Sequence, residues 1–397
     1  MSWNETCIME ERMRFVVACL EGSESVSELC RCFGISRRTG HKWLERFRAE
    51  GVVGLEDRSR APHGNPRAVS AAEVETILAV RRRYDRWGPR KVKAWLESHE
   101  PDISWPAAST IGNLFDRAGL TRPRKRRVRT PPSTVPFSTC REANDIWCID
   151  FKGWFLTGDG TQVDPLTLSD AHSRYLLSCE AVGRTDEAHV WPILERAFYE
   201  YGLPKALRSD NGAPFASRAL GGLSRLAVKL IKTGVLPERI APGKPQQNGR
   251  HERLHLTLKQ ETASPPARTL KAQMARFDRF RQIYNHERPH EALGQVPPAK
   301  RYRSSRRTYT GTLHSPEPPD GALIRKVRSD GTIKWKGELL FLSQVLYGEP
   351  VALLEVESDI YAIKYGPINL ALLKGKRGVC QPGWRIDPAT GNKTGNL

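Results

Sequence analysis

Apolar residues recur at helical spacing through the first third of the chain. They predict a helix over 9–20, a short second helix, and a third helix that begins after Ser36. Gly34 separates the second helix from the third, which is the pattern of a helix-turn-helix module. We expect the start of the third helix to contact DNA through Arg37, Arg38, Thr39, His41 and Lys42. A three-helix bundle with a merely solvated charged face is the alternative.

A second helical module is predicted over residues 61–121, after a first module that covers 1–60. Ser70 and Glu73 have the spacing of a capping box, and two further apolar-patterned helices follow before Gly119. The joint between the two modules is expected within 51–66. Tandem modules of this kind suggest a long or bipartite DNA site.

The pattern changes to alternating strands and helices at about residue 141. Strands are predicted over 146–155, 163–171, 173–182, 206–210 and 239–241, and helices over 185–201, 217–232, 248–262 and about 267–286. This order is typical of a mixed α/β sheet with helices on its faces, and we assign it to a core over 141–305. Residues 316–397 alternate apolar and polar positions between glycine turns, which predicts a small all-β domain that grips DNA or another protomer.

Charge narrows the class of partner. The chain of 397 residues has 63 Lys and Arg against 44 Asp and Glu, so its formal charge is +19. Much of this excess lies in a basic linker over 122–140, which contains Arg124, Lys125, Arg126 and Arg127. A solvated linker is the alternative, but a chain this basic favours double-stranded DNA as the partner.

Other sequence features restrict the compartment and the metal chemistry. No apolar run approaches the length of a membrane helix, and the N-terminus lacks a secretion signal. We therefore expect a soluble intracellular protein. Eight cysteines without a Cys-x-x-Cys pair predict reduced thiols rather than a structural zinc site.

Three carboxylates have placements that suggest catalysis. Asp150 lies inside an apolar strand, Asp210 ends a strand before an Asn-Gly turn, and Glu252 begins a helix. Each has an ordinary structural explanation when taken alone, as a turn residue or a helix-dipole partner. Carboxylates that converge repel one another unless a cation neutralises them, and ligands that are all oxygen favour Mg²⁺ or Mn²⁺. Two such ions suit in-line displacement at a phosphodiester.

Four motifs carry a family resemblance. They are Trp147–Gly153 (WCIDFKG), Arg208–Phe215 (RSDNGAPF), Pro245–Arg253 (PQQNGRHER) and Tyr284–Leu293 (YNHERPHEAL). In this order they resemble the DDE transposases of insertion sequences, which have a retroviral-integrase-type catalytic core. The helix-turn-helix front matches the same family, and the likeness covers roughly residues 10–305.

The resemblance implies a ribonuclease H-like fold in which Asp150, Asp210 and Glu252 bind Mg²⁺ or Mn²⁺, as two ions. It implies a DNA contact at Lys259 and assembly as a homodimer or higher oligomer on DNA. The implied activity is binding of terminal inverted repeats, hydrolysis of a phosphodiester and joining of the 3′-hydroxyl to target DNA. One departure is the interval of 41 residues between Asp210 and Glu252, which is longer than in many members; extra residues within 217–237 would absorb it.

Two alternatives stay open at this point. His251, Glu252 and His255 spell His-Glu-x-x-His, the zinc metalloprotease signature. Zinc dependence with both histidines essential would favour a protease, whereas Mg²⁺ dependence with three essential carboxylates favours the transposase. The second alternative is a DNA-binding regulator with an inactive integrase-like core. The intact triad argues against it.

Overall fold

The computed structural model describes residues 7–58, 68–121, 140–217, 220–240, 249–374, 385–386 and 393–394. The chain divides into two compact units, 1–70 and 71–397. The basic residues Arg124, Lys125, Arg126 and Arg127 lie outside the described residues. Among the helices that are described, none combines the length and the apolar character needed to cross a membrane.

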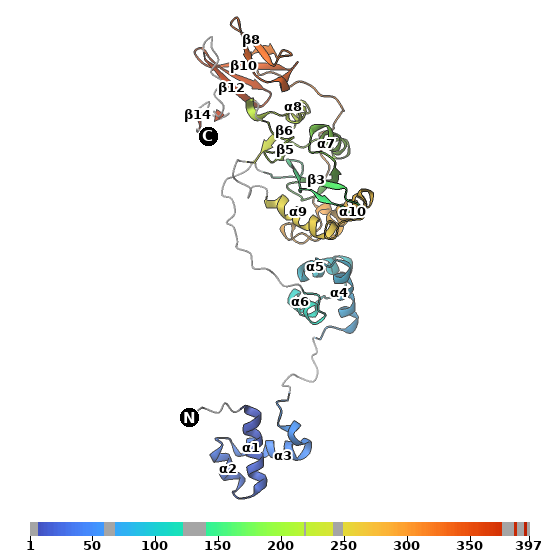
Figure 1. Ribbon diagram of the computed structural model, residues 1–397, viewed down its shortest axis with the longest axis vertical. Helices are drawn as coiled ribbons and strands as arrows, with labels where there is room; N and C mark the ends of the chain where they lie inside the picture. Colours follow the sequence, from blue (N-terminus) through green and yellow to red (C-terminus); the bar gives the residue numbers. More distant parts are fainter. Residues whose placement is uncertain are drawn as a thin grey trace. The chain divides into compact units, whose positions relative to one another are not determined.

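The first unit is the three-helix module that the apolar spacing predicts. It contains α1 (Ile8–Glu21), α2 (Val26–Cys32) and α3 (Arg37–Glu50), drawn in blue in Figure 1. Ser36 caps α3 by accepting a hydrogen bond from the Thr39 amide at 3.1 Å. Gly40 allows α3 to pack closely, because a Cβ there would collide with Cys30 and Phe15. The joint between the two helical modules, expected within 51–66, begins later than residue 51. Leu55 is still fully buried in the core of the first module.

A second three-helix bundle opens the larger unit. Its helices are α4 (Ala71–Arg83), α5 (Pro89–His99) and α6 (Ala108–Arg117), and α4 begins directly after the predicted cap at Ser70. Two side chains of α5 contact the segment that follows the last core helix. Lys91 Nζ donates to the Pro289 carbonyl at 2.7 Å, and Arg90 pairs with Glu291 at 3.3 Å.

The α/β core is built on one mixed sheet. Its strands are β1 (Ile146–Phe151), β2 (Phe155–Leu156), β3 (Gln162–Asp170), β4 (Leu176–Val182), β5 (Ala206–Ser209) and β6 (Leu236–Arg239). β3 lies antiparallel between β1 and β4, whereas β5 and β6 continue the sheet parallel to β1. The single strand expected over 146–155 is in fact two, because Gly153 has a φ of +86° and turns the chain.

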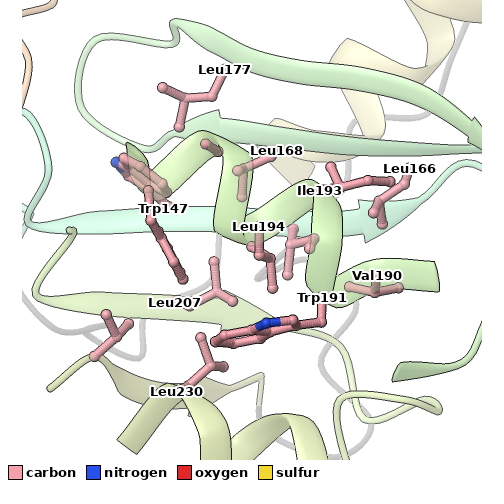
Figure 2. Packing of buried hydrophobic residues seen from close by; sticks show 14 of the residues in the cluster. Trp147, Leu166, Leu168, Leu177, Val190, Trp191, Ile193, Leu194, Leu207 and Leu230 are labelled. Carbon is pink, nitrogen blue, oxygen red and sulfur yellow. The ribbon is translucent and has the colours of Figure 1, made fainter. Parts of the chain in front are cut away.

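Helices cover both faces of this sheet, and side-chain alternation decides which residues meet them. On one face α7 (Glu187–Tyr201) and α8 (Arg225–Lys232) pack against Trp147, Ile149 and Leu207 (Figure 2). On the other face α9 (Gly249–Thr262) and α10 (Leu270–Gln282) pack against Val163 and Cys179. Successive strand residues point to opposite faces. The even-numbered positions of β1 and β5 therefore face the α9 side.

The helix expected over 217–232 is shorter than the sequence analysis predicts. Gly221 and Gly222 both have a φ of +66°, and Ser224 then caps α8 by accepting from the Ala227 amide at 3.1 Å. Gly221 lies against Leu370 of the C-terminal domain. Residues in the long interval between Asp210 and Glu252 therefore contact that domain.

The C-terminal domain is β-rich, as the alternation predicts. Its strands are β7 (Leu323–Lys326), β8 (Thr332–Trp335), β9 (Glu338–Phe341), β10 (Pro350–Glu357), β11 (Ile360–Tyr365), β12 (Ile368–Lys374), β13 (Arg385–Ile386) and β14 (Lys393–Thr394). β12, β11, β10 and β7 form an antiparallel sheet in that order. This sheet shares a buried apolar cluster with Ala227, Val228 and Ile231 of α8, beside which it is drawn in Figure 1.

A buried polar cluster joins the same two elements. Glu349 is 8% exposed and accepts hydrogen bonds from Lys232 Nζ of α8 at 2.6 Å, from Ser315 Oγ at 2.6 Å and from the Tyr365 hydroxyl at 2.9 Å. Burial alone would raise the pKa of the Glu349 carboxyl, but these donors together lower the pKa below its ordinary value. The β-rich domain is therefore attached to the core by both apolar and charged contacts.

Candidate active site of the α/β core

Strand register brings Asp150 and Asp210 to the same edge of the sheet. β1 and β5 are parallel, and Cys148 lies opposite Arg208. Two positions further on, Asp150 and Asp210 hold equivalent places at the carboxyl ends of neighbouring strands. Asp150 lies within β1, where the even-numbered alternation directs its side chain to the face that α9 covers. Asp210 directly follows the last residue of β5, so both aspartates lie at the same edge of the sheet.

Helix α9 carries Glu252 and is fixed next to Asp150 by its histidines. Asp150 pairs with Thr167 across β1 and β3. The Thr167 hydroxyl lies 3.0 Å from His251 Nε2 and 2.8 Å from His255 Nε2, and His255 Nδ1 lies 4.0 Å from the Asp150 carboxylate. The first turns of α9 therefore stand over the strand pair that holds Asp150.

The buried environment keeps both imidazoles neutral. Burial lowers the pKa of His251 to about 4, and burial together with the neighbouring His251 and Lys152 lowers the pKa of His255 to about 3. The Thr167 hydroxyl has one proton, so at least one imidazole must donate to it. The sequence predicts that both histidines share one helix face, and it leaves a zinc site of the metalloprotease type open as the alternative to a structural role. In the structure their partner is a threonine hydroxyl.

The three carboxylates do not form a closed cluster. Glu252 is exposed on α9, whereas Asp150 and Asp210 are partly buried at the sheet edge. Within the parts of the chain that the structure describes, no group of three His, Cys, Asp or Glu side chains is close enough to hold a metal ion. The residues just before α9, 241–248, are outside the description.

Other acidic residues near the first strands have structural partners. Asp170 is fully buried and accepts from the Asn144 amide and from both the amide and the hydroxyl of Ser173. Asp145 accepts from two backbone amides and pairs with Lys205 at 2.7 Å. These contacts account for the two carboxylates without any catalytic role.

Two lysines lie close to each other between β1 and α9. Lys152 follows Asp150 by two residues, and its pKa is lowered by burial and by the nearby charge of Lys259. Lys259 is exposed on α9. The residue predicted to contact a DNA end therefore lies close to a second lysine. Nothing in the apolar sequence around Lys152 indicates that this side chain lies close to Lys259.

Loss of the Thr167 hydroxyl is expected to loosen α9. Thr167→Val keeps the side-chain shape but leaves two buried imidazole nitrogens without their partner, a change of about 1–3 kcal/mol. Amides of α9 should then exchange hydrogen roughly 5- to 150-fold faster, measured by mass spectrometry. Thr167→Ser is the matched control because it retains the hydroxyl. Equal exchange in all three proteins would contradict the assigned role of Thr167.

The helix-turn-helix residues occupy the exposed start of α3. Arg37, Arg38, His41 and Lys42 are exposed, which leaves their side chains accessible to a ligand. Thr39 differs, because its hydroxyl lies 2.8 Å from Ser36 Oγ at the helix cap. The predicted surface is therefore present, with Thr39 also serving the cap.

Comparison with known proteins agrees with this architecture. Two family models described as integrase core domain match residues 141–245 and 233–298. A helix-turn-helix domain matches 11–63, and a homeodomain-like domain matches 39–115. An insertion element IS476 protein of Xanthomonas euvesicatoria is 28% identical over 275 residues, which are 67% of this chain and 75% of that protein. An insertion element IS407 protein of Burkholderia multivorans is 28% identical over 273 residues, 68% of this chain and 88% of that protein.

Solved structures of retroviral integrases are also similar. The catalytic core domain of HTLV-2 integrase in complex with magnesium gives a TM-score of 0.32 at 14% identity and covers 41% of this chain and 98% of that one. A simian T-cell lymphotropic virus intasome in complex with PP2A regulatory subunit B56 gamma gives a TM-score of 0.37 at 17% identity. The match covers 77% of this chain and 99% of that one.

The α/β fold and the four motif-bearing segments define an integrase-core protein with N-terminal helix-turn-helix and homeodomain-like domains. More particularly, the chain is an insertion-element protein with an integrase core. Its broad function is that of an integrase-core transposase with DNA-binding helix-turn-helix domains.

Proposed function

We propose that the chain cuts the ends of its insertion element and joins the freed 3′-hydroxyl groups to target DNA. The observation that supports this proposal is the parallel register of β1 and β5, which brings the carboxyl ends of the two strands, where Asp150 and Asp210 occur, to the same edge of the sheet. The helix-turn-helix modules recognise terminal inverted repeats, and the core performs both phosphoryl transfers.

The residues present fit a pair of divalent cations. Asp150, Asp210 and Glu252 offer only carboxylate oxygens, the ligands that Mg²⁺ and Mn²⁺ prefer. Bound cations would neutralise the phosphate and lower the pKa of the attacking hydroxyl. Asp150 and Asp210 would hold them from the rigid sheet edge, and Glu252 would approach from α9. The exposure of Glu252 leaves that side chain free to turn towards the aspartates.

The remaining residues position DNA. Lys152 and Lys259 would neutralise backbone phosphates next to the reacting bond. The two neutral histidines keep α9 in place without adding positive charge next to Asp150. Two element ends must be held together for joining, so we propose a homodimer or a larger assembly on DNA. We also propose the domain boundaries 1–60, 61–121, 141–305 and 316–397, with a basic linker over 122–140.

The test of this function is a cleavage and joining assay with the full chain. Labelled duplexes that carry the ends of the element would be incubated with Mg²⁺, with Mn²⁺ or with a chelator. We expect cleavage at one position per end and joined products only when a divalent cation is present. Tight, specific binding without cleavage under any of these conditions would favour the regulator with an inactive core.

Removal of the two exposed arginines of α3 is expected to weaken binding of element ends. The double change Arg37→Ala with Arg38→Ala removes up to two phosphate or base contacts, so affinity should fall about 10- to 100-fold. The slope of log affinity against log salt should become shallower by up to about 2. Fluorescence anisotropy at several salt concentrations measures both. Glu45→Ala, on the same helix and also exposed, is the control. Unchanged affinity and slope would remove this surface from the DNA-binding role.

A further inference from the structure

A hollow of about 480 Å³ opens in the α/β core, at the end of the sheet where β1 finishes and α7 begins. Its lining comes from the turn after β1, the start of β3 and the turn that leads into α7: Trp154, Gln162, Asp164, Gly183, Arg184, Thr185 and Asp186. This hollow lies outside the carboxylate triad. Its volume suits a small planar group held between polar side chains.

The most unusual residue of the hollow is Trp154. Gly153 turns the chain out of β1, and the Trp154 side chain that follows is 62% exposed. Its ring offers a large aromatic face on which a planar group can stack.

A buried acceptor lies near this ring. Among the described residues, Asp164 Oδ1 is buried and has no hydrogen-bond partner. A buried oxygen without a donor is costly, and a ligand that carries an N–H group would remove that cost. Arg184 lines the same hollow from the turn before α7 and is exposed. The hollow therefore combines an aromatic face, a hydrogen-bond acceptor and a cation.

We propose that this hollow binds a nucleobase of the bound DNA that has left the base stack. The Trp154 ring stacks on the base, Asp164 accepts from the amino group of an adenine or cytosine, and Arg184 pairs with a neighbouring phosphate. Enzymes that act on a nucleobase turn it out of the duplex, and stacking on an aromatic side chain stabilises an extruded base. The proposal rests on the proposed DNA-processing function and adds a binding site to it.

The base could come from the element end or from the target duplex, and a binding experiment separates these sources. Affinities would be measured with Asp150→Asn, so that no cleavage occurs, for two series of duplexes. One series carries the element end and the other a random target, each with a single mismatch moved one position at a time. A mismatch lowers the cost of extrusion. We expect tighter binding for one position of the mismatch, in only one series.

The side chains of the hollow provide the decisive comparison. Adding Trp154→Ala should weaken binding about 5- to 150-fold and abolish the advantage of the mismatch. Adding Asp164→Asn should shift the preferred base from adenine or cytosine to one that presents a carbonyl oxygen. Tyr199→Ala is the matched control, because Tyr199 is an aromatic residue of α7 that is 61% exposed and does not line the hollow.

Two results would overturn the proposal: no position-dependent gain from a mismatch, or an equal loss from Trp154→Ala on every duplex. The second would make Trp154 a general surface contact. Neither depends on cleavage. If the wild-type chain fails to cleave yet shows the mismatch preference, the proposed catalytic function is wrong and the base-binding site stands.

Discussion

Asp150→Asn is expected to abolish DNA cleavage and joining, by about 10³-fold or more, while element-end binding stays close to that of the wild type. The amide has the shape of the carboxylate but no charge. It cannot neutralise a divalent cation, and transition-state charge stabilisation is the largest part of such catalysis. The same loss is expected for Asp210→Asn and Glu252→Gln. Gel analysis of labelled duplexes measures cleavage, and anisotropy measures binding.

Asp278→Asn is the matched control, because Asp278 is exposed on α10 and far along the chain from the triad. It should cleave like the wild type. A variant of Asp150 that still cuts and joins would show that this aspartate is not part of the reaction. A variant that loses binding together with cleavage would indicate a folding defect, so hydrogen exchange of β1 should accompany the assay.

Lys232→Met is expected to destabilise the attachment of the β-rich domain by about 3–5 kcal/mol, because it leaves the Glu349 carboxylate buried without its cation. The two side chains are 21% and 11% exposed. Amides of β10 should then exchange about 100- to 4,000-fold faster. Lys229→Met in the same helix is the control, since Lys229 pairs with Glu187 and is 35% exposed. Equal exchange rates of the β10 amides in the two variants would contradict the role of the Lys232–Glu349 pair in attaching the β-rich domain.

The same pair predicts the sign of a pH effect. The pKa of Glu349 is lowered in the folded chain, so its contribution is fully present above the unfolded-state pKa of about 4.3 and is lost as pH falls through the folded value. Protection of β10 in the wild type should therefore decline in acid, from about pH 4 downwards. In Lys232→Met that decline should be weaker, because the carboxylate has lost the donor that lowers its pKa.

Sequence patterns predict the elements of the core well where periodicity and capping agree. Ser36 and Ser70 mark the starts of α3 and α4. The placement of Asp150 and Asp210 in the predicted strands drew attention to them, but the resemblance of the four motifs was needed to assign them a role. The strand pattern failed at Gly153, because the apolar residues Trp154 and Phe155 continued it beyond the turn. The glycine was the available signal.

Long-range contacts account for what the sequence could not show. The i, i+4 spacing of His251 and His255 fixes a shared helix face but not the Thr167 hydroxyl, which comes from a strand far earlier in the chain. The burial of α8 on two sides could have been predicted from its sequence. A helix that is apolar around most of its surface must be covered on both sides. The orphaned oxygen of Asp164 and the exposure of Trp154 could not have been predicted, because both depend on the folded surface.

The shared cluster of α8 and the β-rich sheet has a consequence during protein synthesis. Helix α8 leaves the ribosome well before the strands that cover Ala227, Val228 and Ile231. An interrupted chain that ends before β10 would carry an uncovered apolar helix face, the kind of surface that leads to aggregation or degradation. Cellular quality control would thus remove incomplete copies that already contain all three carboxylates. The full-length chain alone would persist to act on DNA.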